Sequence, residues 1–264
     1  GSLDRERNGG GTDYFVAKLD NDGTKLWTRL SKDRNEEKIT AITIDVDGNL
    51  YATGWVPTLD GVSYPNSLCL LKFDVNGDLT WIKPVPVPGI NYGGISVDVD
   101  AFGDIIVAGH HLNSYEYFLA KFNDSGSSVW FEASTSPTNI HVSGAVTDDQ
   151  GNILVAGYTS EAIDGNQVSG GYDAILVGHA SSGERLWSVQ YGSDGNDYTG
   201  GIVRSLAGCF FIGGHTFGQL GNKQYGSADI FLTRFEDAEL PTGPELTVDA
   251  VLPTRLTGQT LTGT

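Results

Sequence analysis

The stretch Asp13–Trp27, DYFVAKLDNDGTKLW, returns along the chain, and this repetition decides the fold. It recurs as SLCLLKFDVNGDLTW at 67–81, EYFLAKFNDSGSSVW at 116–130 and DAILVGHASSGERLW at 173–187, and it begins again as DIFLTRF at 229–235. The tryptophans that end the full copies lie 54, 49 and 57 residues apart. A repeat of this length is the sequence signature of similar units that stack on one another.

A second motif alternates with the first. It reads AITIDVDGNLYATG at 41–54, ISVDVDAFGDIIVAG at 95–109 and AVTDDQGNILVAG at 145–157, with a degenerate copy, IVRSLAGCFFIGG, at 202–214. Each unit therefore holds four short apolar runs separated by Gly, Asp and Asn turns. We name them A, B, C and D in chain order: the second motif supplies A and B, and the first supplies C and D.

These runs predict β-hairpins, because turns such as DNDG (20–23) and DVDG (45–48) divide them and no window has a sustained helical period. Four antiparallel strands per unit are typical of a propeller blade, whose sheet its neighbours cover on both faces. A β-sandwich would show stricter polar and apolar alternation and no blade-length period. The sequence therefore predicts an all-β propeller of four-stranded antiparallel blades, with about five whole or partial blades present.

Composition limits the partners. Lys and Arg number 16 against 33 Asp and Glu, a net charge of -17, which disfavours nucleic acid and anionic lipid. No apolar run is long enough for a membrane helix, so we expect no membrane insertion. Cys69 and Cys209 fall in different units and predict two buried thiols rather than a disulfide. The sequence contains no methionine, which indicates a piece of a longer protein.

The units resemble SBBP repeats, a β-propeller repeat of bacterial proteins. The resemblance rests on DYFVAKLDNDGTKLW, AITIDVDGNLYATG and GSDGNDYTGGI (192–202) and covers residues 1–237. It weakens at Gly178 and His179, which replace an Ala-Lys pair, and at Ser205, which replaces an aspartate. The family implies a ring of about seven blades in a secreted or cell-surface protein, so the resemblance predicts an arc of such a ring with an extracellular or cell-surface location.

The chain beyond the repeats changes in composition. Residues 238–246 carry prolines and acids and are predicted to be a linker. Residues 247–264 are threonine-rich and β-prone. Two interpretations stay open for them: the start of a further β module, such as an immunoglobulin-like domain, or a tail.

One rim of the predicted propeller gathers aspartates, because A–B and C–D turns lie on that side. Alternating carboxylates offer the hard oxygen ligands that calcium prefers, so calcium is the one cofactor that the sequence suggests. The candidate ligands are Asp45, Asp47, Asp98 and Asp100. The alternative is that these residues only form the turns, since no third ligand and no closing glutamate follow at the required spacing.

The opposite rim carries B–C and D–A loops of variable length, and loops of this kind on a rigid scaffold often carry recognition. The residue after the B-run glycine is a flat ring in four units. Rings of this type stack on sugars, so we predict a binding surface for a glycan or a partner protein, made by Trp55, His110, His111, Tyr158 and His215. The alternative is that the rings shield strand ends from water.

Two further positions recur in every unit. The D-run tryptophans are predicted to pack between blades rather than to bind sugar: Trp27, Trp81, Trp130 and Trp187. A basic column in the C runs is predicted to pair with acids such as Asp45 or Asp98: Lys18, Lys72, Lys121 and Arg234, with His179 as the odd member.

For function, the sequence favours a non-enzymatic binding or adhesion module, and no catalytic residue is assigned. The inner runs ITAITI (39–44), GGISV (93–97), SGAVT (143–147) and GGIVR (200–204) contain Arg204 as their one charge, so no carboxylate pair for glycoside chemistry is visible. The histidines are too few and too scattered for a metal site. The alternatives are part of a propeller enzyme, either a glycoside hydrolase or lyase or a quinoprotein-like enzyme, and a purely structural spacer.

Overall fold

The computed structural model is all-β, and the residues that it describes contain no helix. The described residues are 2–3, 6–7, 11–31, 35–59, 61–64, 68–89, 91–114, 116–134, 139–220, 226–236 and 247–253. Within these ranges the strands form four four-stranded antiparallel sheets and three two-stranded ones. Consistent with the absence of long apolar runs, no helix in these ranges is long and apolar enough to cross a membrane.

Each four-stranded sheet is one blade, and its strands lie side by side in the predicted order A, B, C, D. Blade 1 consists of β5 (Lys38–Ile44), β6 (Leu50–Trp55), β9 (Leu68–Phe73) and β10 (Leu79–Pro84). Blade 2 consists of β11 (Tyr92–Val99), β12 (Ile105–His111), β13 (Tyr117–Phe122) and β14 (Ser128–Ala133).

The next two blades repeat this order. Blade 3 consists of β15 (His141–Thr147), β16 (Ile153–Thr159), β17 (Asp173–His179) and β18 (Arg185–Tyr191). Blade 4 consists of β19 (Asp197–Arg204), β20 (Cys209–Thr216), β21 (Asp229–Glu236) and β22 (Thr247–Pro253). The prediction of a propeller with about five whole or partial blades is confirmed.

Three small pairs of strands complete the fold. An N-terminal half-blade supplies only the C and D strands, β3 (Phe15–Leu19) and β4 (Lys25–Leu30). One short hairpin, β1 (Ser2–Leu3) with β2 (Glu6–Arg7), precedes β3. A second, β7 (Thr58–Leu59) with β8 (Val62–Ser63), lies in the B–C loop of blade 1.

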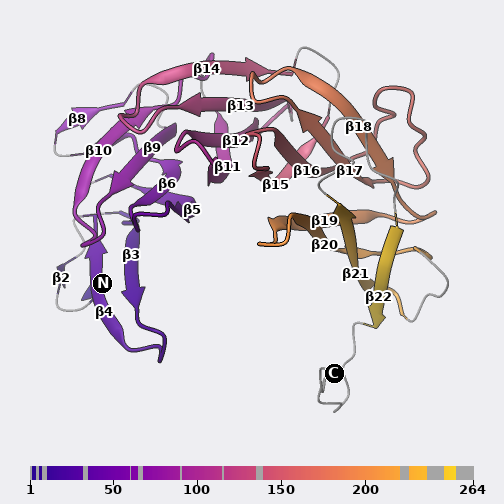
Figure 1. Cartoon of the computed structure of the whole chain (residues 1–264), viewed down its shortest axis with the longest axis horizontal. Coiled ribbons are helices and arrows are strands. Elements are labelled where there is room, and N and C mark those ends of the chain that lie inside the picture. Colours follow the sequence, from indigo (N-terminus) through magenta and orange to yellow (C-terminus); the bar gives the residue numbers. More distant parts are fainter. Residues whose placement is uncertain are drawn as a thin grey trace.

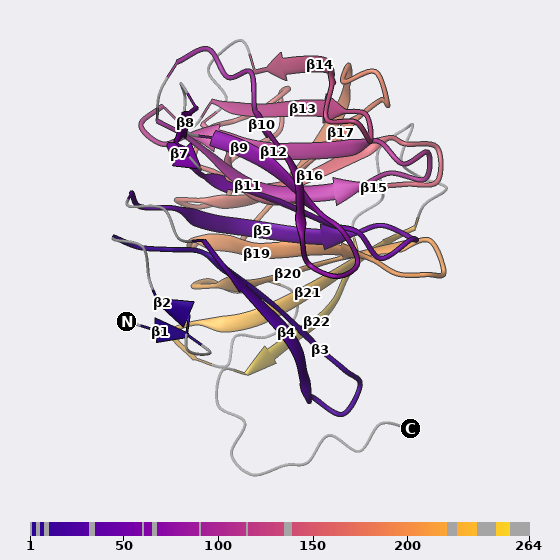
Figure 2. The ribbon, with the colours of Figure 1, turned by 90° about the vertical axis from the view of Figure 1, so that its left-hand side faces the viewer.

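Figure 1 shows the blades as an arc, with the half-blade at one end and β21 and β22 at the other. The inner strands β5, β11, β15 and β19 follow its inner edge. Hydrogen bonds join one inner strand to the next: Thr40 Oγ1 donates to the Gly94 carbonyl (2.6 Å), and Ser96 Oγ donates to the Ala145 carbonyl (3.0 Å). Figure 2, seen from the N-terminal side, shows that the β3–β4 hairpin runs obliquely to β5 and β19.

The outer strand of blade 4 comes from the C-terminal segment. Residues 247–253 form β22, which pairs with β21 from Asp229↔Pro253 to Arg234↔Thr247. The pairing supplies partners to the backbone groups along the outer edge of β21. The sequence left two interpretations for this stretch, and neither specified this strand. The predicted linker 238–246 and the end of the chain, 254–264, lie outside the described residues.

Both faces of a blade are buried, as the apolar C runs predicted. All residues of β9 are buried, and its neighbouring side chains enter different clusters. Leu70 packs with Val107 and Phe118 of blade 2, whereas Leu71 packs with Tyr14 of the half-blade. Full burial of a leucine contributes about 1.5–3 kcal/mol, so an isolated blade would lose contributions of this size on both of its faces. Cys69 and Cys209 are both buried and form no disulfide, as predicted.

The A–B and C–D turns share one geometry. In the turn after β5, the Gly48 amide donates to the Asp45 carbonyl (3.1 Å) and Gly48 has a φ of 82°. This is a type I turn followed by a left-handed glycine, a common connection in β-hairpins. Asp45 Oδ1 accepts from the amides of Asp47 (3.0 Å) and Asn49 (2.8 Å), so the aspartate stabilises the turn with its own side chain.

The recurring tryptophans pack between blades, as predicted. Trp27 of the half-blade lies over Gly77 in the C–D turn of blade 1, where a Cβ would be 2.7 Å from the ring. Trp81 lies over Gly126 in the same way, and Trp130 lies over Gly183, each with 3.2 Å to such a Cβ. Each tryptophan thus fills the space that the glycine of the next blade leaves open.

The basic column needs a correction. Lys121 pairs in register with Trp130, and Gly178 pairs with Trp187, so Gly178 rather than His179 occupies the column position. His179 ends its strand where Phe73 ends β9. The partners of the column also differ from the predicted Asp45 and Asp98. Lys121 Nζ pairs with Asp100 (2.8 Å) and Asp104 (3.1 Å), and Lys72 pairs with Asp124 of the next blade.

Candidate binding rim

The rim made by the B–C and D–A loops carries two recurring positions per blade. The last residues of the B strand pair with the first residues of the A strand, which brings side chains from both strands to the same edge. The register pairs are Lys38 with Trp55, Gly93 with His110, His141 with Tyr158, and Tyr198 with His215. Residues at the start of the A strand therefore contribute to this rim as much as those at the end of the B strand.

Rings from blades 2, 3 and 4 touch one another in a continuous row. His110 meets His141 with 6.0 Å between ring centroids, and His141 stacks on Tyr158 at 4.6 Å with the planes 10° apart. Tyr158 meets Tyr198 edge to face at 4.9 Å, and Tyr198 lies 5.2 Å from His215. We call the complete set the aromatic rim: His110, His141, Tyr158, Tyr172, Tyr198, His215 and Phe217.

The exposure of the aromatic rim changes along the row. His110 is buried in blade 2, and Tyr158 and Tyr198 are half-buried. Phe217 is 47% exposed at the blade 4 end. The row thus opens to solvent toward blade 4, where ring faces are accessible for stacking.

Backbone hydrogen bonds hold Tyr172 between the other rings. Its amide donates to Asn196 Oδ1 (3.0 Å), and its carbonyl accepts from the Asp197 amide (2.6 Å). These bonds tie the B–C loop of blade 3 to the D–A loop that leads into blade 4. As a result the Tyr172 ring contacts Tyr158 at 5.6 Å and Tyr198 at 5.5 Å.

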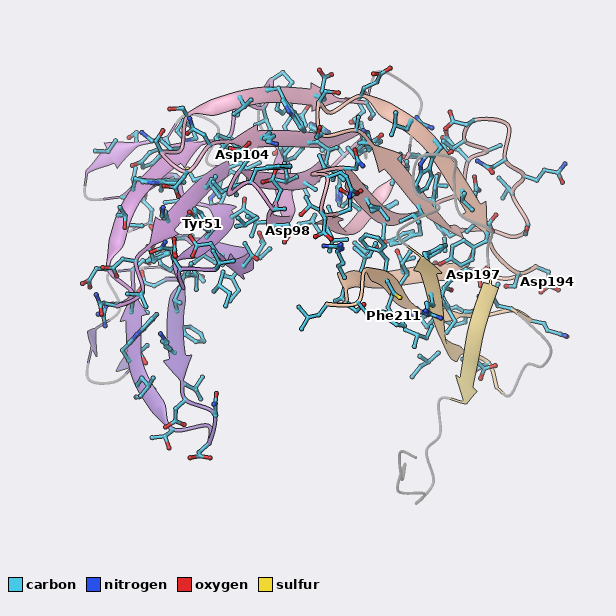
Figure 3. All side chains as sticks on the ribbon, viewed as in Figure 1. Tyr51, Asp98, Asp104, Asp194, Asp197 and Phe211 are labelled. Atoms are coloured by element: carbon cyan, nitrogen blue, oxygen red, sulfur yellow. The ribbon has the colours of Figure 1, made fainter. Side chains whose placement is uncertain are left out.

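Two fully buried carboxylates anchor these loops. Asp173 accepts from the Ser169 amide (2.7 Å), and Asp197 accepts from the Ser193 amide (2.7 Å). Gly192 lies between them, since a Cβ there would be 2.3 Å from Asp173 Oδ1 and 2.9 Å from Asp197 Oδ2. Figure 3 shows Asp197 beside the strands of blade 4 and Asp194 farther out. Because buried acceptors are costly unless they are hydrogen-bonded, this arrangement fixes the loop backbone under Tyr172 and Tyr198.

The buried part of the aromatic rim is uncharged at neutral pH. Burial lowers the pKa of His110 to about 4, and the neighbouring His141 and His111 add to the shift. Burial also lowers the pKa of His141. These imidazoles therefore act as neutral rings, and the surface that they form favours stacking over charge pairing.

Trp55 lies apart from this row and lines a pocket of about 390 Å³ between blades 1 and 2. The ring is 38% exposed. The pocket is largely apolar, with Tyr92, Ile95 and Leu112 in its wall, and Lys38 at its edge. Its size falls within the roughly 300–1,000 Å³ that is common for small-molecule pockets.

His111 does not face the aromatic rim. Successive residues of a strand point to opposite faces, so it points away from the side of His110. Its Nδ1 accepts from the Ser114 amide (3.2 Å), and its ring contacts Tyr92 at 4.9 Å. Of the five predicted ligand residues, the structure brings together His110, Tyr158 and His215, and it places Trp55 and His111 elsewhere.

The four predicted calcium ligands do not fit a common site. Asp45 is engaged in its turn: burial favours a higher pKa, but hydrogen bonds from Asn49, Asp47 and Tyr51 outweigh it and lower the pKa. Asp100 Oδ2 accepts from Lys121 Nζ. No group of three or more His, Cys, Asp or Glu side chains in the described ranges is arranged to hold a metal ion.

Asp98 belongs to an inner strand rather than to a turn. It lies within β11, and Oδ2 accepts from both the amide and the hydroxyl of Thr147 in blade 3, each at 2.8 Å. Burial raises its pKa, although the Thr147 bonds oppose the shift. The inner strands as folded thus contain more charge than Arg204, which pairs with Asp149 (2.8 Å).

Sequence reasoning missed four members of the aromatic rim: His141, Tyr172, Tyr198 and Phe217. Two of these begin A strands and become visible once the A and B strands are paired in antiparallel register, because His141 then lies opposite Tyr158 and Tyr198 opposite His215. Tyr172 and Phe217 are loop residues outside the repeated runs, so the pattern of the runs does not mark them.

Comparisons with known proteins support the fold. No family model and no curated protein matches the sequence. Among solved structures, hydrazine synthase of Kuenenia stuttgartiensis is similar, with a TM-score of 0.60 and 12% identity over 91% of this chain and 60% of that chain. A protein of unknown function from Bacteroides caccae has a TM-score of 0.43 and 11% identity over 93% and 95% of the two chains. At 12% identity the likeness to hydrazine synthase shows the β-propeller fold alone.

Proposed function

We propose that this protein is a non-catalytic binding module whose aromatic rim holds a glycan, as part of a secreted or cell-surface protein of the SBBP-repeat type. The observation that carries the proposal is the continuous row of rings across blades 2 to 4. The CH-rich face of a sugar ring stacks on such a surface, and hydroxyl groups bond at its edges.

The charge of the protein limits the class of glycan that can bind. The net charge of -17 repels anionic sugars, and the histidines His110 and His141 are neutral at pH 7. A neutral glycan therefore suits the aromatic rim better than a uronic acid or a sulfated chain. The exposed blade 4 end, with His215 and Phe217, supplies the most accessible ring faces.

A glycan array followed by calorimetry tests the proposal. The double variant His215→Ala/Phe217→Ala removes exposed rings, so folding should be retained while binding of the selected neutral glycan weakens about tenfold or more, which corresponds to about 1.4 kcal/mol. Phe102→Ala is the matched control, because Phe102 is 70% exposed but lies in an A–B turn on the opposite rim.

Three results would overturn the proposal. Binding that is equal in the wild type and the double variant would place the glycan elsewhere. A partner protein whose capture depends on the same two rings would replace the glycan as ligand. If no neutral glycan on the array binds, the alternative of a purely structural spacer would be favoured.

A further inference from the structure

The outer parts of neighbouring blades meet in equivalent contacts, which we call outer wedges. In each, the C and D strands of one blade face the C–D turn of the next. Ser31 in the first wedge and Ser134 in the third occupy the same position, because their amides donate to the carbonyls of Tyr14 (3.0 Å) and Tyr117 (2.9 Å). The first wedge lies between the half-blade and blade 1, and the third between blades 2 and 3.

The rings in these two wedges also correspond. Tyr14 meets Phe73 edge to face, with centroids 6.3 Å apart and planes at 79°. Tyr117 meets His179 in the same way, at 5.8 Å and 79°. In the third wedge the contact is a hydrogen bond as well, since Tyr117 OH lies 3.1 Å from His179 Nε2.

The tautomer of His179 follows from its second contact. Nδ1 lies 2.9 Å from the Gly183 carbonyl, which only accepts hydrogen bonds, so Nδ1 carries the proton. Nε2 of the neutral ring therefore accepts from Tyr117 OH. The two rings form a fixed polar wall. The tyrosine oxygen also accepts a hydrogen bond from Arg185, which leaves one lone pair for a further hydrogen bond.

A pocket of about 420 Å³ lies against this wall. Ser134 Oγ is buried there and has no hydrogen-bond partner among the described residues, whereas Ser31 Oγ in the first wedge donates to Glu37 Oε2 (2.9 Å). Ile140 stands in the third wedge where Glu37 stands in the first, directly before the A strand. The serine of the third wedge thus has its hydrogen-bonding capacity available to a ligand.

The mouth of the pocket carries like charges. In the first wedge, Arg29 Nη2 pairs with Asp78 Oδ1 (3.1 Å) and links the two blades. The equivalent residues of the third wedge are Glu132 and Glu184, two carboxylates that both line the pocket. Arg185 also lines it, but it pairs with Asp164. The pocket therefore offers carboxylates and hydroxyls with no unpaired cation nearby.

We propose that the third wedge binds an amino sugar. The ammonium group would lie between Glu132 and Glu184, and the ring hydroxyls would bond to Ser134 Oγ and Tyr117 OH. A purely apolar ligand would leave the buried Ser134 hydroxyl unsatisfied, and an anion would meet two carboxylates in a protein of net charge -17. The site shares no residue with the aromatic rim and does not depend on the function proposed for it.

NMR titration of the whole chain at pH 7 tests this assignment, with the His179 ring signal as reporter. The probes are glucosamine, glucose and glucuronate. Glucosamine should shift the His179 signal at millimolar concentration and bind about tenfold more tightly than glucose, and glucuronate should not bind. A glucosamine β-linked at a chain end distinguishes a terminal glycan residue from a free sugar.

Matched variants complete the test. Glu132→Gln changes only charge at an exposed position and should remove the preference for glucosamine over glucose. Ser134→Ala should weaken both by several-fold, whereas Ser31→Ala and Asp78→Asn in the first wedge should change neither. Three results would each overturn the proposal: glucosamine binding no tighter than glucose, a glucosamine preference that Glu132→Gln leaves intact, or a His179 signal that does not move at about 50 mM glucosamine, well above a millimolar Kd.

Discussion

The first and third outer wedges have the same backbone, yet the side chains of the first bond to one another and leave a smaller pocket than those of the third. In the first, Tyr14 packs on Phe73, Ser31 bonds to Glu37 and Arg29 pairs with Asp78 across the blades. In the third, His179, Ile140 and the pair Glu132/Glu184 replace these partners, and the pocket grows from about 270 to about 420 Å³. A few substitutions at repeated positions thus turn a packing contact into a polar pocket without changing the strands that frame it.

The largest effect on stability should come from removing the ring that packs on the tyrosine in each wedge, Phe73 in the first and His179 in the third. Phe73→Ala deletes a fully buried side chain and should lower the free energy of unfolding by about 3–5 kcal/mol. His179→Ala should cost about half as much, since the ring is smaller and faces a pocket. Urea denaturation measures both, and an equal cost would contradict the difference between the wedges.

Lowering the pH should have the next largest effect on stability, and of the two wedges only the third should respond, because the first has no histidine at this position. The pKa of His179 is lowered to about 4, mainly by burial. Between the ordinary value near 6.5 and 4, the unfolded chain binds a proton that the native chain does not, so stability present above pH 6.5 is lost as the pH falls. The loss from this ring is about 3 kcal/mol at pH 4.

His179→Phe restores the residue type of the first wedge and should remove this part of the acid sensitivity. Denaturation at pH 7.5 and pH 4 compares it with the wild type, and the loss due to His110 cancels because both chains contain it. Parallel stability curves for the two chains would show that His179 titrates normally.

The serines should differ by a smaller amount. Ser31→Ala removes a donor from the buried Glu37 carboxylate and should cost about 1–3 kcal/mol. Ser134→Ala removes a hydroxyl whose site offers no protein partner among the described residues, and should change stability by less than about 0.5 kcal/mol. Thermal unfolding measures the stability of the two variants. A larger loss of stability for Ser134→Ala than for Ser31→Ala would contradict the proposed difference between the wedges.

The smallest effect should follow from closing the third wedge. Glu132→Arg reproduces Arg29 and places a cation beside Glu184, which should stabilise the protein by about 0.5 kcal/mol because such surface pairs are weak. Glu132→Gln is the control that removes the negative charge at this position without adding an ion pair. A destabilised Glu132→Arg chain would argue against the equivalence of Arg29 and Glu132.

The sequence predicted the features that recur in every repeat unit. The order of strands, burial on both faces and the packing of Trp27, Trp81 and Trp130 all follow from a pattern that recurs in each unit. It did not predict the features that depend on register. His179 looked like a member of the lysine column because residues were matched by charge, whereas pairing with Arg185 places it in the apolar position.

The candidate sites were less predictable than the fold. His110, Tyr158 and His215 were found because they follow a repeated glycine, but His141 and Tyr198 required the A–B register, and Tyr172 and Phe217 sit in loops unique to one blade. The wedge pocket arises from contacts between residues about 50 positions apart, which a single sequence read without its repeat alignment does not bring together.

The titration of His179 by NMR tests the central claim most directly, namely that a polar ring has replaced the packing phenylalanine in one wedge. We expect a titration midpoint near pH 4 and a proton on Nδ1 at neutral pH. Tyr117→Phe should raise the midpoint only slightly, because burial is the main cause of the low pKa. A midpoint near pH 6.5, or a proton on Nε2 at neutral pH, would contradict it.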